Sequence, residues 1–294
     1  MDFLRSGLVL GFTVGSIAGC RSGDKTSTSA GGAGSGGPSA GSAAHIVPWF
    51  PKAAPLLLAP GRTPDRSLIA WADTTQVEPE GGLTDSNATF VHLDGSIEKG
   101  RVAITQSAEG CTEAAIDPAP ATTWGVGFIG GSPTPLRVDS IRGMSPKDST
   151  ALTRTAYRLA STVPNGAGSR FGGLAFVLVD LWRVTLPGGK VAVVASLRRQ
   201  INQEDSPMQE RTFIVAESDS LASDGYSLAY SERSSGLEET VESHELLAAF
   251  TFAPATAVDF LVAHDFGDET SYAILERITP AKWGMRWTSQ RFSC

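Results

Sequence analysis

Two long apolar runs joined by a three-residue turn constrain the fold of this chain more than any other feature of its sequence. The runs are Leu174–Leu186 and Lys190–Gln200, and Pro187-Gly188-Gly189 separates them. Apolar runs rich in valine on either side of a Pro/Gly turn predict a β-hairpin. In the first run Val177, Val179 and Leu181 make the second face apolar as well, which predicts a central strand whose middle is buried on both sides.

Shorter segments of the same character occur along the rest of the chain. They are enriched in β-branched and aromatic residues, are bounded by Gly, Pro, Asp and Asn, and follow one another at short intervals, which predicts an antiparallel meander arranged as a sandwich or barrel-like fold. The segment 238–250 is rich in Glu, Leu and Ala and allows a helix by propensity, but we predict a strand over about Val241–Phe252. The other predicted strands are Ser67–Asp73, Ala88–Asp94, Arg101–Gln106, Thr122–Gly130, Arg211–Glu217, Tyr226–Glu232, Val258–Asp265, Ser271–Ile278 and Lys282–Ser289.

One helix is predicted at about 145–163. Ser145 is a capping residue, Pro146 suits the first helical position and Asp148 places a carboxylate in the first turn. Apolar residues follow at helical spacing, and a Pro-Asn-Gly sequence ends the pattern. Because the apolar stripe is narrow, we predict an amphipathic helix that covers one face of a sheet. The stripe consists of Leu152, Ala156, Leu159 and Val163.

Composition bounds the class of protein. Residues 45–294 make up 250 residues, and this length predicts either one β-rich globular domain or two sub-domains divided near residue 165. The chain is 41% hydrophobic and 19% charged, with a net charge of −7. An acidic chain lacks the basic footprint of nucleic-acid binding, so we predict no nucleic-acid partner.

The first twenty residues have the organisation of an export signal. Arg5 and the amino terminus make the leading end weakly positive, and an apolar stretch runs from about Leu8 to Ile17. This stretch is about half the length that a membrane-spanning helix requires, so it fits a signal h-region. A cytosolic protein with a chance cysteine at position 20 is the alternative.

The sequence Ile17-Ala18-Gly19-Cys20 resembles the lipobox of bacterial lipoproteins. The resemblance covers residues 1–20 only. It implies cleavage before Cys20, lipidation of the Cys20 sulfur and acylation of the new amine by chains such as palmitate. It therefore implies membrane attachment through acylated Cys20 and a location in the bacterial cell envelope. Arg21 rather than Asp resembles the outer-membrane sorting pattern of a bacterium with two membranes.

Two further features agree with an exported protein. Residues 21–44 consist mostly of Gly, Ser, Ala and Thr, which predicts a flexible tether. Apart from Cys20, the chain has the two cysteines Cys111 and Cys294. In an oxidising compartment this pair predicts a disulfide, and two separate thiols are the alternative.

Residues able to bind a metal are few and scattered. The four histidines are His45, His92, His244 and His264, so a metal site would need distant histidines to converge. The acidic turn of Asp265, Asp268 and Glu269 is a weak candidate for calcium, which favours clustered carboxylates. We predict no cofactor, and regard these carboxylates as solvated turn residues.

The sequence contains no catalytic motif among the common hydrolase, nucleotide and zinc signatures. The polar run 198–211 is interpreted as a solvated turn joined by Arg–carboxylate pairs, with a recognition loop as the alternative. We therefore expect a lipid-anchored, non-enzymatic binding or scaffold module whose partner is another envelope protein or a small ligand. Two alternatives remain: a hydrolase with a carboxylate site among Asp180, Glu204 and Glu210, and a solute-binding module with an aromatic cleft among Trp49, Trp71 and Trp124.

Overall fold

The structure is a computed structural model that describes residues 55–58, 66–71, 86–106, 112–118, 120, 124–129, 133–166, 169–203, 206–218, 225–252, 257–289 and 291. All of these belong to one compact unit, Pro48–Cys294. The signal, the lipobox Ile17–Cys20, the tether and the predicted cysteine pair lie outside the described residues. No helix in the described ranges has both the length and the apolar character needed to span a bilayer.

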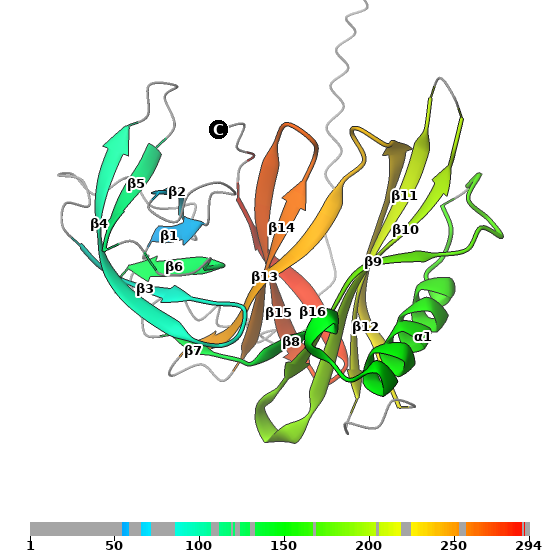
Figure 1. Cartoon of the computed structure of the whole chain (residues 1–294), viewed down its shortest axis with the longest axis horizontal. Helices are drawn as coiled ribbons and strands as arrows, with labels where there is room; N and C mark the ends of the chain where they lie inside the picture. The colour runs from blue at the N-terminus through cyan, green and yellow to red at the C-terminus, as the bar shows by residue number, and fades with distance from the viewer. Residues whose placement is uncertain are drawn as a thin grey trace, which may run out of the picture. The chain divides into compact units, whose positions relative to one another are not determined.

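Six strands at the start of this unit pair in a closed ring (Figure 1). The pairing order is β1-β2-β5-β4-β3-β6, every pair is antiparallel, and β6 pairs with β1 as well as with β3. The strands are β1 (Pro55–Leu58), β2 (Arg66–Trp71), β3 (Ser86–Val91), β4 (Ile97–Gln106), β5 (Thr112–Asp117) and β6 (Val126–Ile129).

The remaining strands form two five-stranded antiparallel sheets with the same plan, a three-residue strand followed by a four-stranded meander. The first sheet contains β8 (Val138–Ser140), β9 (Val177–Thr185), β10 (Val191–Ile201), β11 (Met208–Ser218) and β12 (Ser227–Leu237). The second sheet contains β7 (Pro133–Pro135), β13 (Ser243–Phe252), β14 (Val258–Asp265), β15 (Thr270–Thr279) and β16 (Lys282–Thr288). The prediction of a mainly β fold with antiparallel sheets and one covering helix is confirmed.

The predicted helix is α1 (Pro146–Thr162), the one α-helix in the described part of the chain. Asp148 N donates to Ser145 Oγ at 3.1 Å, which satisfies one of the unpaired N–H groups at the helix start. Leu152, Ala156 and Leu159 pack on the outer face of the first sheet, against Val193 and other apolar side chains. Figure 1 shows α1 lying against this sheet.

The second sheet is covered on both faces. One face packs against the first sheet, where Phe260 and Trp283 meet Val194 and Phe213. The other face packs against the ring, where Phe250 contacts Phe128 with ring centroids 5.1 Å apart. The second sheet therefore forms the centre of the folded unit.

The backbones of the ring and the second sheet come close together at Gly125. A Cβ atom at this position would lie 1.9 Å from the carbonyl oxygen of Leu247. Leu247 sits where the pairing of β13 with β14 shifts register, so the backbone bulges toward the ring at this point. Only glycine fits this contact.

The prediction about the central hairpin is confirmed in part. The turn 187–189 and strands β9 and β10 form as expected, and Leu181 and Trp182, on opposite faces of β9, are 1% and 5% exposed. Val177 and Val179, by contrast, are 50% and 40% exposed. Within the described residues β8 pairs only with Trp182–Val184, so the first half of β9 has no described neighbouring strand on that side. The strand at the centre of this sheet is β10.

The interpretation of 198–211 as a solvated turn is wrong. Strands β10 and β11 pair as far as Ile201 and Met208, and the side chains of Arg199, Gln209 and Glu210 are buried. By contrast, the strand predicted over Val241–Phe252 is confirmed by β13.

Candidate metal centre

Two of the scattered histidines lie side by side in the folded chain. His244 of β13 and His264 of β14 are direct partners in the antiparallel register, so their side chains share one face of the second sheet. Their ring centroids are 4.5 Å apart. The face that they share is the one turned toward the first sheet.

Glu232 completes the group from the opposite sheet. It lies on β12, and its Oε2 atom is 2.7 Å from His244 Nε2 and 4.0 Å from His264 Nε2. One ligand atom from each of the three residues lies within 4.8 Å of the others. In a tetrahedral site with bonds of about 2.1 Å, ligand atoms are about 3.4 Å apart. The observed distances bracket this value, so a small adjustment would place all three around one ion.

Glu242 orients His264. Its Oε1 atom is 2.7 Å from His264 Nδ1, and this hydrogen bond is the main cause that holds the pKa of Glu242 below its ordinary value, while burial opposes it. An ionised carboxylate only accepts, so Nδ1 carries the proton. Nε2 of a neutral His264 then has a free lone pair on its Glu232 side. A carboxylate behind a histidine in this way is the usual outer partner of metal-binding imidazoles.

Tyr230 holds Glu232 in place. Its hydroxyl donates to Glu232 Oε1, which leaves Oε2 toward the histidines. Burial raises the pKa of Glu232, but hydrogen bonds with His244 and Tyr230 lower it further, so the net shift is downward. Burial and the neighbouring Glu232 raise the pKa of Tyr230. Tyr230 therefore keeps its proton and donates to an ionised carboxylate.

His244 is the most enclosed of the three. Its side chain is 2% exposed and stacks on Phe213 with ring centroids 5.2 Å apart. Its Nε2 atom faces Glu232 Oε2 at 2.7 Å and Glu242 Oε1 at 3.6 Å. A cation held between His244 Nε2 and Glu232 Oε2 would replace this direct contact.

The three side chains line a cavity of about 420 Å³ between the two sheets. The carboxylates of Glu232 and Glu242 are partly exposed there, so solvent reaches the site. Two imidazoles and one carboxylate with an open side are the ligand set of solvent-accessible zinc sites, whereas calcium prefers six to eight oxygens. The other lining residues are Arg233, Ser234, Phe266, Ser271, Met285, Thr288, Ser289 and Arg291.

The acidic turn predicted from the sequence lies elsewhere, between β14 and β15. Asp265 Oδ1 accepts from Gly267 N at 3.1 Å, and Glu269 Oε2 pairs with Arg291 at 3.2 Å. The described residues bring neither of these carboxylates, nor Asp268, into the histidine group. His92 lies in the ring, 3.4 Å from Glu98, and His45 is outside the described residues.

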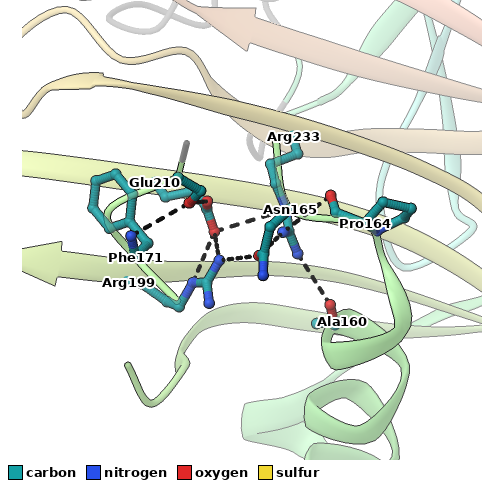
Figure 2. Close-up of polar contacts among 8 residues, drawn as sticks. Ala160, Pro164, Asn165, Phe171, Arg199, Glu210 and Arg233 are labelled. Carbon is teal, nitrogen blue, oxygen red and sulfur yellow. Dashed lines mark hydrogen bonds and ion pairs between the residues drawn. The ribbon is translucent and has the colours of Figure 1, made fainter. Parts of the chain in front are cut away.

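Of the carboxylates suspected for a hydrolase, Glu210 is 2% exposed and belongs to a buried network (Figure 2). Its carboxylate accepts from Arg199 and lies 3.7 Å from Arg233 Nε, and both arginines also donate to Asn165 Oδ1. Arg233 donates to the carbonyl oxygens of Ala160 and Pro164 as well, 3.1 and 3.2 Å away, and so joins β12 to the end of α1.

The other suspected residues do not assemble. Burial raises the pKa of Asp180, which is half-buried on β9, but no contact joins it to Glu210 among the described residues; Glu204 is outside them. Trp124 is buried against Phe90, with ring centroids 4.8 Å apart. Trp71 ends β2 and its side chain is not described, and Trp49 lies outside the described residues.

Sequence reasoning identified His244 and His264 only as histidines that would have to converge, and it missed Glu232, Glu242 and Tyr230. A signal for the histidine pair existed, because both stand at nearly equal distances from the turn between β13 and β14. Glu232 comes from the other sheet, so no local pattern marks it.

Searches against protein-family models, curated proteins and solved structures find no match to this chain.

Proposed function

We propose that this protein is a lipid-anchored module that binds a divalent transition-metal ion, zinc in the first instance. The observation that carries the proposal is the convergence of His244, His264 and Glu232 on one buried point, with Glu242 behind His264. The ligand types select the ion, because imidazole with carboxylate suits zinc and its neighbours in the first transition series.

Zinc titration of the full chain, purified in detergent and treated with a chelator, tests the proposal. Calorimetry should give one site per chain. Glu242→Gln should weaken zinc binding by about 10- to 100-fold, as for other outer-shell partners. Glu232→Gln, His244→Gln and His264→Gln should weaken it more, because each removes a ligand.

His92→Gln is the matched control, since His92 is also buried and also lies near a carboxylate. It should leave zinc affinity unchanged. Absence of zinc binding by the wild-type chain, or equal weakening by His92→Gln and His244→Gln, contradicts the proposal.

The location is a separate part of the proposal and is supported by the sequence of residues 1–44. Attachment of acyl chains at Cys20 would hold the chain in the bacterial envelope, because two or more chains give stable anchoring. Cys20→Ala should abolish incorporation of labelled palmitate and release the protein from membranes. Unchanged partition of this variant contradicts lipid anchoring.

The disulfide between Cys111 and Cys294 stays part of the same proposal. It suits an oxidising compartment. Titration of free thiols in the native, mature protein should find none, and two reactive thiols would exclude the bridge.

A metal-dependent hydrolase is the second candidate, favoured by the open side of the three-ligand set, since catalytic zinc sites keep such a position. Zinc-dependent hydrolysis of p-nitrophenyl acetate that Glu232→Gln removes would favour the enzyme. Tight zinc binding without turnover would favour the binding module.

A further inference from the structure

The cavity is lined by hydrogen-bond donors as well as by the two carboxylates. Ser271 and Arg291 line it together with Glu232 and Glu242. A hydroxyl and a guanidinium can donate, whereas ionised carboxylates only accept. The cavity therefore offers both donors and acceptors to a bound ligand.

Ser271 is placed next to the metal ligands by the register of the second sheet. His264 pairs with His244 on one side and with Ser271 on the other, so the three side chains form a row on one face. Ser271 is 3% exposed and lines the cavity. A serine hydroxyl can donate a hydrogen bond, so Ser271 can donate to a ligand bound beside His264.

Arg291 supplies a positive charge that could bind an anion in the cavity, because its present ion pair is weak. Its guanidinium carbon lies 3.9 Å from the ring centroid of Phe266, and its Nη1 donates to Glu269 Oε2 at 3.2 Å. The side chains of this ion pair are 58% and 46% exposed, so the pair is weak. The remaining N–H groups of the guanidinium suit an oxyanion, which this fork binds well.

The charges fit a ligand with an oxyanion. A divalent ion would offset the carboxylates of Glu232 and Glu242, and Arg291 would then offset a further negative group. We propose that the metal-loaded cavity binds a small molecule through a carboxylate or phosphate group, with one oxygen on the metal and the others accepting from Ser271 and Arg291. This inference rests on the proposed metal site.

Cobalt in place of zinc makes both the binding of the metal and the binding of the anion visible. The absorption bands of bound Co²⁺ report the number and type of its ligands. The full chain is loaded with Co²⁺ in a buffer free of carboxylate and phosphate and then titrated with acetate, inorganic phosphate or neutral acetamide. Acetate or phosphate should change the spectrum saturably, and acetamide should not. The anion that binds more tightly identifies the ligand class.

Two variants test how the anion is held. Arg291→Ala should weaken anion binding by about tenfold or more, as expected for a charged hydrogen bond, and Ser271→Ala by about 2- to 10-fold. Neither should alter cobalt affinity. Arg286→Ala is the control, because Arg286 of β16 pairs with Glu276 of β15 and is not among the residues that line the cavity.

The outcomes separate the two proposals. Failure to bind cobalt overturns the proposed function and this inference together. Cobalt binding with a spectrum that neither anion changes, or with anion affinity unaffected by both variants, overturns this inference alone.

Discussion

At the scale of single residues, buried carboxylates hold the layers of this protein together. Glu217 of β11 is buried and accepts from Arg277 Nε and Nη2, both at 2.7 Å, from Ala281 N at 3.1 Å and from Trp283 Nε1. It thus joins the first sheet to the second. Glu210, on the same strand, lies beside Arg199 and Arg233 of the first sheet, and Arg233 in turn donates to the Ala160 carbonyl oxygen of α1.

Glu217 should make stability depend on pH in acid. Burial raises its pKa, but the hydrogen bonds from Arg277, Ala281 and Trp283 lower it more, so the net pKa lies below the ordinary 4.5. The resulting stabilisation is full above the unfolded-state pKa and is lost as pH falls through the folded-state pKa. Urea midpoints of the wild type, measured with a chelator present, should fall as pH is lowered below about 4.5. Glu217→Gln should be less stable at pH 7 and show a shallower decline, and an unchanged decline contradicts the assignment.

Glu210→Ala should destabilise the protein by about 3–5 kcal/mol, because it leaves Arg199 buried without its carboxylate. The control is Glu269→Ala, which breaks the exposed pair with Arg291 and should cost at most about 1 kcal/mol. Equilibrium unfolding in urea measures both. Equal small effects would show that the buried network contributes little.

At the scale of elements, the contact between the ring and the second sheet depends on one glycine. Gly125→Ala would force a Cβ into the Leu247 carbonyl oxygen, so the two layers would have to separate locally. We expect a loss of about 1–3 kcal/mol or more. Gly166→Ala is the control because nothing lies within 4 Å of its added Cβ. Equal stability of the two variants in urea would contradict the close contact.

Local signals account for the elements that the sequence predicts well. Helix α1 follows from Ser145, Pro146 and the apolar spacing behind them, and the β9–β10 hairpin follows from two apolar runs and one turn. The exposure of Val177 was not predictable, because it depends on where the three-residue strand β8 stops pairing. The closing pair of the ring, β1 with β6, joins segments far apart in the chain.

Contacts between segments far apart in the chain also limit what the sequence predicts about the candidate site. The sequence identifies histidines and acidic residues but carries no periodicity that brings Glu232 across from the other sheet. The interpretation of 198–211 failed for a related reason, since Arg199 and Glu210 look solvated in the sequence, whereas Arg199 contacts Asn165 and Phe176 in the segment that follows α1.

At the scale of the whole molecule, the candidate metal ligands come from both sheets, so an ion would bind the folded state and have no site in the unfolded chain. At a free zinc concentration of 100 times Kd, the added stability is about 2.7 kcal/mol. For a domain of this size that corresponds to a rise in Tm of about 5–10 °C. Thermal scans should show this rise for the wild type and not for Glu232→Gln. An equal rise in that variant would place the ion elsewhere.

The covering of the second sheet on both faces has a consequence for how such an ion would enter and leave. His244 and His264 stand on neighbouring strands enclosed by the ring on one side and the first sheet on the other, so their positions are fixed by packing. Glu232 stands on β12, an edge strand whose residues are mostly half-exposed. Glu232 is therefore the ligand on the less enclosed side of the site. An ion would enter and leave past this carboxylate, while packing keeps the two imidazoles in the same positions before and after exchange.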